Sequence, residues 1–253
     1  MHRILIFNLG GTSTKLAVFD EETLVVEGTI RHTDREIQGC TDNAEQIAFR
    51  RGAIEAWLLE NHISLDDLSA VVIRSSGAGL CKKGGTYLVT GKLRDGMYAA
   101  YRGSFPKAPH PSFIVLPLAD EILGSRPIPI YIVDPDGVDE FQDVAYITGH
   151  PDLPRSSGFH VLNHKAIARK ASRDLGKRYE DADLVVAHMG GGISIAAHRH
   201  GMVVDSTSGG SAGEGPFGTN RTGPLPLNKL VDRCFSGAYT KSEIMDLIMN
   251  QGG

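Results

Sequence analysis

Hydrophobic and polar residues follow one another in the same order at two places along the chain. Residues 4–20 and 184–198 each begin with an apolar run, continue through a glycine-rich turn that carries hydroxyl side chains, and end where polar and apolar residues alternate. Apolar runs and alternation over a few residues are typical of β-strands. The pattern therefore predicts two units of strand, glycine loop and strand, about 180 residues apart.

The rest of the chain alternates between predicted strands and helices. Third strands are expected after the two units at 22–30 and 202–206, and short apolar runs predict strands at 70–74 and 129–133. Helical spacing of apolar residues predicts helices at 43–60, 112–124, 163–175 and from 240 onward. This order predicts an α/β fold, with mixed sheets flanked by helices.

The predicted helices carry signals at their ends and along their faces. Asp42 with Glu45, and Thr240 with Glu243, have the spacing of a capping box. Pro117 predicts that helix 112–124 begins or bends at that residue. The apolar residues that align along one face are Ile47, Ile54, Trp57 and Leu58 in the first helix and Ile167, Ala171 and Leu175 in the third.

The repeated three-strand order predicts a duplicated architecture. A loop at 149–160 is rich in Gly, Pro and His and separates the two copies. We therefore expect a first half at 1–150 and a second half at 151–253. The long glycine-rich stretch 208–226 has no periodicity, and such a loop inside a compact domain is usually functional.

Both glycine loops have the composition of a phosphate clamp. Gly10 and Gly11 form the first turn, and Gly190, Gly191 and Gly192 form the second. Residues without Cβ let the backbone turn tightly and approach a ligand, so that successive N–H groups converge on phosphate oxygens. Two such loops at matching places in two halves predict a nucleotide site.

Composition excludes several other classes of protein. The net charge of −4 gives no basic face for nucleic acid, and no apolar run approaches the roughly 18 residues that span a membrane. The start of the chain lacks the cleavage site of a signal peptide. Cys40, Cys81 and Cys234 match neither a disulfide framework nor a zinc site. We therefore expect a cytoplasmic enzyme.

The charged residues favour a carboxylate as the acceptor of a phosphoryl group. A sugar hydroxyl needs a base to take its proton, whereas a carboxylate is already ionised near neutral pH. A carboxylate site should instead hold Arg and His, which keep two anions together. Arg74, Arg155 and Arg221 fall at strand ends or in glycine-rich loops, and six of the ten histidines lie between 150 and 200.

Each candidate residue also has a purely structural interpretation. In that alternative, Ser13 and Lys15 are an outward-facing strand pair, His188 is a core histidine, His198 and His200 are surface residues beside a turn, Arg74 is an ion-pair partner, Asp134 caps a turn with Pro135, and Glu214 pairs with Arg221.

Taken together, the motifs resemble those of the acetate and butyrate kinase family, within the actin-like ATPase-domain superfamily, and the butyrate kinase branch is the more similar. The resembling segments are 8–15, 84–87, 134–135, 154–155, 159–160, 163–166, 187–194, Asp205, and 213–217 with Arg221. The histidine with its triple glycine at 188–192 and the Gly-Glu-Gly-Pro-Phe loop at 213–217 are the specific pieces. Gly191 stands where acetate kinases tend to have Asn, which favours the butyrate branch.

The resemblance implies a two-domain enzyme with duplicated actin-like ATPase domains. It would transfer the γ-phosphoryl group of ATP to butyrate, or form ATP from ADP and butanoyl phosphate, with Mg²⁺ as cofactor and a homo-oligomer, a dimer or larger, as the assembly. The implied phosphate-binding residues are Asn8, Gly10, Gly11, Thr12, Ser13, Lys15, His188, Gly190, Gly191, Gly192 and Ser194. The implied catalytic residues are Arg74, Asp134, His160 and Arg221, with Asp134 near the metal and Arg74, Arg155 and Glu214 at the substrate.

The resemblance also implies parts beyond residue 253, because family members are longer. An adenosine-binding Gly-Gly motif, a further metal-associated glutamate and closing helices are expected there. We therefore expect the 253-residue chain to bind ATP weakly and to associate or aggregate. Two alternatives remain open: an inactive relative that binds anions or dimerises, and a sugar kinase of the same superfamily.

Overall fold

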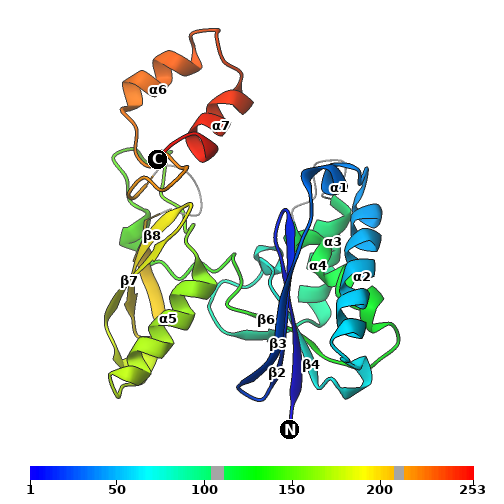
Figure 1. The fold of residues 1–253 in the computed structure, drawn as a ribbon. Coiled ribbons are helices and arrows are strands. Elements are labelled where there is room, and N and C mark those ends of the chain that lie inside the picture. Colours follow the sequence, from blue (N-terminus) through cyan, green and yellow to red (C-terminus); the bar gives the residue numbers. More distant parts are fainter. Residues whose placement is uncertain (104–110, 208–213) are drawn as a thin grey trace. The chain divides into compact units, whose positions relative to one another are not determined.

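The computed structural model describes residues 1–103, 111–207 and 214–253, and its internal contacts divide the chain into two units. The first unit holds residues 1–81 and 85–137, and the second holds 82–84 and 138–253 (Figure 1). Residues 138–150, which the sequence assigned to the first half, pack with the second unit. Residues 82–84, which the sequence also assigned to the first half, belong to the second unit as well.

A six-stranded mixed sheet forms the centre of the first unit. Its strands lie in the order β3-β2-β1-β4-β6-β5. β1 pairs antiparallel with β2 and parallel with β4, and β5 pairs antiparallel with β6. The strand bounds are β1 Arg3–Leu9, β2 Ser13–Asp20, β3 Thr23–Arg31, β4 Ala70–Ile73, β5 Thr86–Leu88 and β6 Ile130–Val133.

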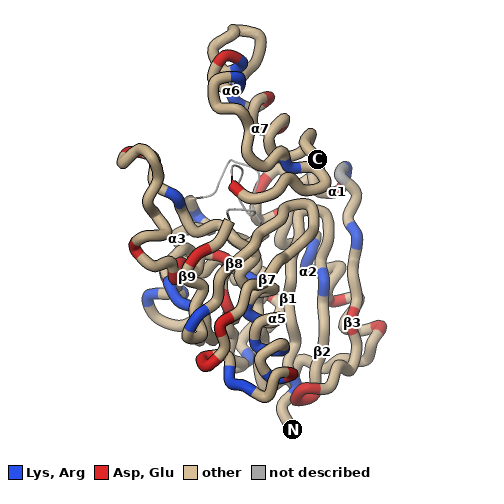
Figure 2. Tube along the Cα trace, turned by 90° about the vertical axis from the view of Figure 1, so that its left-hand side faces the viewer, with Lys and Arg blue, Asp and Glu red and all other residues tan. Residues whose placement is uncertain are grey.

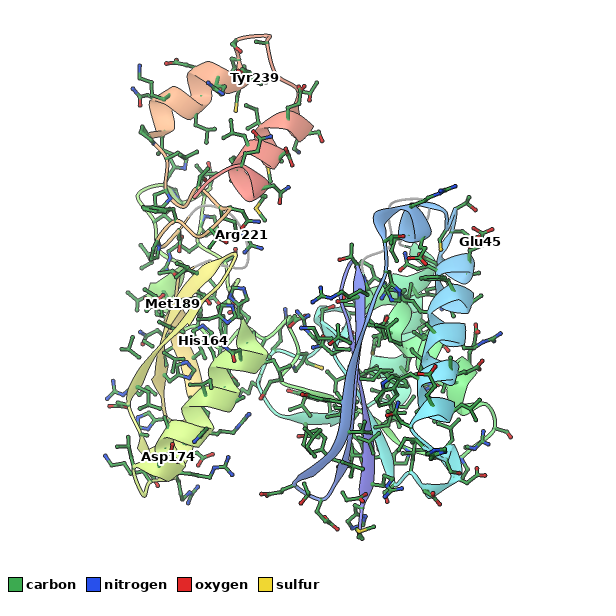
Figure 3. All side chains as sticks on the ribbon, viewed as in Figure 1. Glu45, His164, Asp174, Met189, Arg221 and Tyr239 are labelled. Carbon is green, nitrogen blue, oxygen red and sulfur yellow. The ribbon has the colours of Figure 1, made fainter. Side chains whose placement is uncertain are left out.

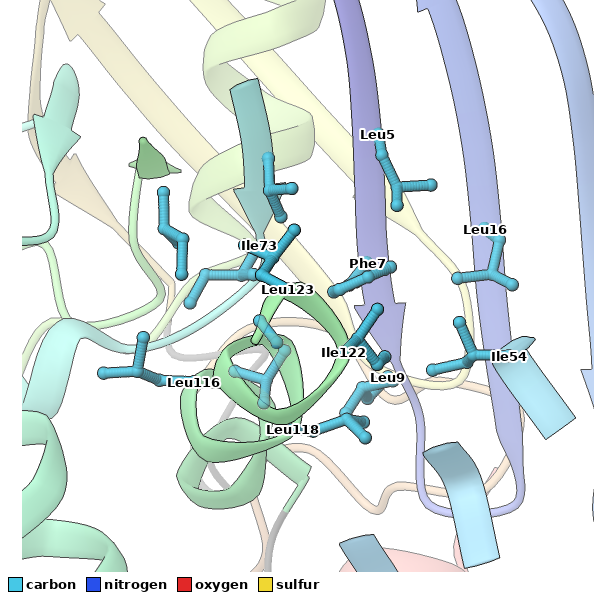
Figure 4. Close-up of a cluster of buried hydrophobic side chains, with 14 of the residues drawn as sticks. Leu5, Phe7, Leu9, Leu16, Ile54, Ile73, Leu116, Leu118, Ile122 and Leu123 are labelled. Atoms are coloured by element: carbon cyan, nitrogen blue, oxygen red, sulfur yellow. The ribbon is translucent and has the colours of Figure 1, made fainter. Parts of the chain in front are cut away.

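Helices cover one face of this sheet. Leu5 and Phe7 of β1 alternate with less buried residues and pack under α2 and α4, in the core that Figure 4 shows. The helix bounds are α1 Asp34–Gln38, α2 Asn43–Glu60, α3 Gly91–Gly103 and α4 Pro111–Leu123. Pro117 lies inside α4 and is buried, so the helix does not begin there.

The second unit contains a three-stranded antiparallel sheet in the order β7-β8-β9. Its bounds are β7 Leu184–Met189, β8 Ile193–Arg199 and β9 Met202–Ser206, and the helices of the unit are α5 Val161–Asp174, α6 Leu227–Cys234 and α7 Lys241–Asn250. The capping box of Thr240 and Glu243 at α7 is confirmed. Short 3-10 helices lie at Leu65–Asp67, Gly77–Gly79, Asp143–Tyr146 and Tyr179–Asp181.

The apolar stripe predicted for the third helix is not its buried face. Ile167 is 46% and Leu175 63% exposed, whereas His164, Lys165 and Ser172 are buried. Each buried polar side chain has a partner: Ser194 for His164, Glu140 for Lys165 and the carbonyl of Ala168 for Ser172. These polar contacts therefore join helix α5 to Ser194 of β8 and to Glu140, while Ala168 packs against Val186 of β7 in a small apolar cluster.

Charge and hydropathy show no membrane-spanning element in the part of the chain that is described. No helix among these residues is both long enough and apolar enough to cross a bilayer. Acidic and basic residues are interspersed along the trace (Figure 2).

Helix α6 exposes apolar side chains along its length and just after its end. These residues are Leu227, Val231 and Phe235.

Candidate active site

The first glycine loop joins β1 to β2 in a tight turn. The amide of Gly10 donates to the carbonyl oxygen of Ser13 at 2.8 Å. Asn8 and Lys15 lie opposite each other across the two strands and line one groove on the sheet. Lys15 is exposed. The loop therefore offers an amide and an ammonium group beside exposed backbone at Gly11 and Thr12.

A buried arginine that the sequence analysis missed lies beneath this loop. Both terminal nitrogens of Arg50, from the middle of α2, donate to the carbonyl oxygens of Gly10, Gly11 and Ser13 and to Thr14 Oγ1. Its position in the sequence could have indicated that it is buried. Arg50 is three residues after Ile47 and four before Ile54, so helical spacing puts all three on one face.

Arg74 lies beside the first glycine loop because β4 is the parallel neighbour of β1. Its Nη1 donates to Asn8 Oδ1 at 3.5 Å, and its Nη2 lies 3.3 Å from Asp136 Oδ2. Carboxyl ends of parallel strands meet at one edge, which is where open α/β sheets bind ligands. The ion pair with Asp136 is partly exposed, and such pairs contribute about 0–1 kcal/mol.

Asp134 directly follows β6 and has a left-handed conformation, with φ of +42°. Its Oδ1 accepts from the amide of Gly85 at 2.8 Å, and its own amide donates to the carbonyl of Gly85 at 2.9 Å. The side chain of Asp134 therefore binds the loop before β5. The structural alternative, in which Asp134 caps a turn with Pro135, did not include this contact. Left-handed backbone at a non-glycine residue costs about 1–3 kcal/mol and is often found at functional sites.

The second glycine loop joins β7 to β8, and His188 lies just before it. Asn163 Nδ2 donates to His188 Nδ1 at 2.9 Å, so neutral His188 carries its proton on Nε2. A Cβ built on Gly190 would lie 3.2 Å from that Nε2. His188 therefore directs an N–H group along the glycine loop.

His160, at the N-terminus of α5, stacks on His188. The ring centroids are 3.7 Å apart and the planes 11° from parallel. Ser194 Oγ lies 2.8 Å from His160 Nδ1 and 2.8 Å from His164 Nε2. Ser194 is buried and has no other acceptor among the described residues, so its one proton is donated to one ring and its oxygen accepts from the other.

The orphan nitrogen of His164 decides the direction of these hydrogen bonds. His164 Nδ1 is buried without a partner among the described residues. A buried N–H without an acceptor is costly, so the proton of His164 lies on Nε2 and is donated to Ser194. Ser194 then donates to His160 Nδ1. Neutral His160 consequently carries its own proton on Nε2, the nitrogen that Ser194 does not bind.

Two of the histidines are held neutral by burial. Desolvation lowers the pKa of His164 to about 4, assisted by His188, and it lowers the pKa of His198 to about 4, assisted by His164 and Lys165. His198 is 2% exposed and its Nδ1 lies 2.7 Å from the hydroxyl of Tyr179. The interpretation of His198 as a surface residue is therefore wrong; that of His200 is confirmed.

Arg155 and Glu214 pair with each other in the second unit. Arg155 Nε donates to both carboxylate oxygens of Glu214 at 3.0–3.1 Å, and its Nη1 lies 2.9 Å from Asp205 Oδ1. Its terminal nitrogens also donate to the carbonyls of Ala145 and Ser206. The ion-pair partner of Glu214 is thus Arg155 and not Arg221, and these contacts brace the loop that begins at Glu214.

The segment that carries Arg221 packs against the second glycine loop. A Cβ on Gly218 would lie 2.3 Å from the carbonyl oxygen of Gly191, and Asn220 Oδ1 is 3.2 Å from the position of a Cβ on Gly191. Figure 3 shows Arg221 beyond the hairpin end at which Met189 lies. Because Gly191 and Gly218 have no side chains, the two backbone segments pack closely, and Arg221 therefore lies near the second loop. Gly213, part of the predicted loop, lies outside the described residues.

The predicted site residues form two groups, one in each unit. The first unit holds Asn8, Gly10, Gly11, Thr12, Ser13, Lys15, Arg74 and Asp134, and the second holds Arg155, His160, His188, Gly190, Gly191, Gly192, Ser194, Glu214 and Arg221. Within the described ranges, no three His, Cys, Asp or Glu side chains group as a metal site.

Comparison with known proteins identifies the family. The acetokinase family model matches residues 150–230, which contain the second glycine loop. The chain is 41% identical to butyrate kinase 1 of Clostridium acetobutylicum over 255 aligned residues, which cover all of this chain and 69% of that protein. The chain belongs to the acetokinase family. Members of this family are phosphotransferases whose acceptor is a carboxyl group, so the expected class of enzyme is confirmed.

Solved structures agree on the fold of this acetokinase family chain. The acetate kinase of Porphyromonas gingivalis matches with a TM-score of 0.74 and 17% identity, over 100% of this chain and 69% of that one. A propionate kinase of Francisella tularensis matches with a TM-score of 0.69 and 17% identity, over the same shares. The predicted α/β fold of actin-like ATPase type is thereby confirmed.

Proposed function

We propose that this protein transfers the γ-phosphoryl group of ATP to butyrate, forming butanoyl phosphate and ADP, and catalyses the reverse reaction. The observation that carries the proposal is the 41% identity to a butyrate kinase along the whole chain. In the forward direction a carboxylate oxygen forms a bond to the γ-phosphorus while the bond to the ADP oxygen breaks. No proton is transferred, which fits a site rich in Arg and His rather than one built around a carboxylate base.

In the first unit, the turn from Gly10 to Ser13 and Lys15 would bind phosphate oxygens of the nucleotide. Arg74 would bind an anion at the edge where β1 and β4 end, because its guanidinium is partly exposed there. Arginine suits this role because its planar fork meets carboxylate and phosphate oxygens with two parallel hydrogen bonds.

In the second unit, Gly190, Gly191 and Gly192 would bind phosphate through backbone amides, and Arg221 would add positive charge. His160 would donate its Nε2 proton in a hydrogen bond to the transferring phosphoryl group, because Ser194 holds its Nδ1. Such a preorganised donor stabilises charge that develops in the transition state. Arg155 and Glu214 would act through the loop that they brace.

Mg²⁺ would accompany the nucleotide, with Asp134 as the protein carboxylate nearest to it. The ion is commonly held by one or two carboxylates together with substrate phosphates. A single carboxylate at the end of β6 fits that donor set, and its Oδ1 is already bound by the Gly85 amide. Asp134 would help to hold the ion beside the phosphate groups of the nucleotide. Homo-oligomerisation and a cytoplasmic location stay predictions.

The reverse reaction tests this proposal. We would supply ADP, Mg²⁺ and butanoyl phosphate and measure ATP by luminescence, with His160→Ala as the negative control. The protein would be used as 253 residues and in a form extended by the C-terminal part of the Clostridium acetobutylicum enzyme. ATP formation that depends on His160 supports the function. No ATP in the extended form would favour the inactive, anion-binding alternative.

A further inference from the structure

Arg50 is the largest fully buried side chain of the described residues, and it is charged. Its Nη1 donates to Ser13 O at 3.0 Å and to Thr14 Oγ1 at 2.9 Å. Its Nη2 donates to Gly10 O at 2.9 Å and to Gly11 O at 2.8 Å. A charge in a protein interior is stable only with hydrogen bonds and an opposite charge. Arg50 has the hydrogen bonds.

The opposite charge is missing from the described part of the chain. No carboxylate among these residues lies within ion-pair distance of Arg50, and its Nε has no hydrogen-bond partner there. Desolvation lowers the pKa of Arg50 to about 10, and the neighbouring Cys40 opposes this. The guanidinium stays protonated at neutral pH, directly under the first glycine loop, as a buried cation without a counter-charge among the described residues.

The carbonyls that bind Arg50 also fix where the loop amides point. In a trans peptide the C=O of one residue and the N–H of the next point in opposite directions. Since the carbonyls of Gly10 and Gly11 point down to Arg50, the N–H groups of Gly11 and Thr12 point away from it. Both residues are exposed, and within the described chain neither N–H donates a hydrogen bond. Two free amides thus face outward above a buried cation.

Thr14 and His32 hold the guanidinium in this orientation. Thr14 Oγ1 accepts from Arg50 and is buried with no acceptor other than His32 Nε2 among the described residues, so its proton is donated to that nitrogen at 2.8 Å. His32 is therefore neutral, with its proton on Nδ1, and burial followed by the charge of Arg50 lowers its pKa. His32 also packs edge-on against Phe49. Arg50 is fixed from the side as well as from above.

We propose that Arg50 is a positioning residue for phosphate binding: it aims the amides of Gly11 and Thr12 at a phosphate group, whose negative charge compensates the buried guanidinium. The ligand class rests on the proposed function, in which the first loop binds nucleotide phosphates. The bound phosphate and the buried Arg50 guanidinium then stabilise each other, with the peptide groups of the loop between them. Arg50 itself does not touch the ligand.

Binding of inorganic pyrophosphate tests this role without requiring catalysis. Calorimetric titration would compare the wild-type chain with Arg50→Met, Arg50→Lys and the matched control Arg51→Met. Arg51 is the neighbouring residue, partly exposed and paired with Glu55 and Glu121 at the surface, so its removal changes net charge equally. We expect Arg50→Met to weaken binding about tenfold or more and Arg51→Met to change it less than about twofold.

The lysine variant separates orientation from charge and remains informative if Arg50→Met does not fold. Lysine keeps the charge but lacks the fork that reaches four acceptors, so we expect it to recover only a minor part of the affinity. In ¹⁵N spectra, pyrophosphate should shift the amide signals of Gly11 and Thr12 in wild type and in Arg51→Met but not in Arg50→Met.

Three results would overturn the proposal: equal pyrophosphate affinity in wild type and Arg50→Lys, unmoved Gly11 and Thr12 signals in wild type, or no pyrophosphate binding by wild type. If the protein does not phosphorylate butyrate but its Arg50 variants lose pyrophosphate binding, the role of Arg50 is supported. Only butyrate as the proposed phosphoryl acceptor is then rejected.

Discussion

The imidazole rings of His160 and His188 stack with their centroids 3.7 Å apart, at the start of α5 and the end of β7. Each ring has its Nδ1 bound by a neighbour, Ser194 for His160 and Asn163 for His188. The hydrogen bonds therefore leave Nε2 as the protonated nitrogen on both rings. Two N–H donors stacked beside a glycine loop are suited to bind a phosphoryl group.

Removing the Ser194 hydroxyl should impair His160 without removing it. In Ser194→Ala, His160 Nδ1 loses its donor and the ring is free to place its proton on either nitrogen. We expect kcat for butyrate phosphorylation to fall about 10- to 100-fold, as for other small errors of positioning, with little change in KM for ATP. Steady-state kinetics of the extended protein checks this. Ser194→Thr, which keeps a hydroxyl, should retain more activity; equal kcat in Ser194→Ala and wild type would contradict the hydrogen-bond direction.

Stability should fall in acid because of the buried histidines. The pKa of His164 and that of His198 are about 4 in the folded chain, below the usual 6.5. The unfolded chain therefore binds more protons below pH 6.5, and stability is lost as the pH falls from 6.5 to 4, by about 3 kcal/mol for each group. Above pH 6.5 neither histidine contributes a pH dependence.

Urea unfolding at a series of pH values measures this loss. His198→Gln should flatten the stability curve between pH 6.5 and 4, whereas His200→Gln, at an exposed position, should leave its shape unchanged. Identical curves for wild type and His198→Gln would show that burial of His198 does not suppress its protonation.

Much of this arrangement follows from the sequence. The parts that could not be predicted from it share one cause. Strand and glycine-loop positions were predictable because alternation and glycine report backbone geometry directly. The buried face of α5 was not, because His164, Lys165 and Ser172 are polar and become buried only through partners on other elements. Arg50 was missed for the same reason: its acceptors lie about 40 residues away in the chain. Helices α1, α3 and α6 and strand β5 were also missed: α1, α6 and β5 are short, and α3 contains Gly91, Gly96 and Gly103, which are poor helix formers.

Substitutions at Arg74 distinguish a role in anion binding from a purely structural role. If Arg74 binds substrate, Arg74→Ala should cost about 2–4 kcal/mol of transition-state stabilisation and Arg74→Lys should rescue little. Its ion pair with Asp136 is partly exposed, so thermal stability should change little. Asp136→Ala breaks the same pair and is the matched control. If kcat/KM fell equally in Arg74→Ala and Asp136→Ala, the ion pair alone would account for Arg74.

Gly191 tests the second phosphate loop. It is exposed, and the atom nearest to a Cβ there is Oδ1 at the end of the Asn220 side chain, at 3.2 Å, so a small shift of that side chain makes room. Gly191→Val should therefore lower the unfolding temperature only slightly, while its side chain obstructs the approach of phosphate. Gly149→Val is the control, because no atom lies within 4 Å of a Cβ there. We expect weaker ADP binding by calorimetry in Gly191→Val alone. Unchanged ADP affinity in that variant would argue against phosphate binding at this loop.

The choice of acceptor tests the central claim most directly. ATP, Mg²⁺ and hydroxylamine would be supplied with either butyrate or glucose, using the extended protein, and both butyryl hydroxamate and ADP would be measured. Hydroxylamine traps an acyl phosphate but not a sugar phosphate. We predict butyryl hydroxamate in step with ADP when butyrate is present, and no ADP above background with glucose. ADP formation with glucose, and no hydroxamate with butyrate, would contradict the assignment of this protein as a carboxylate kinase.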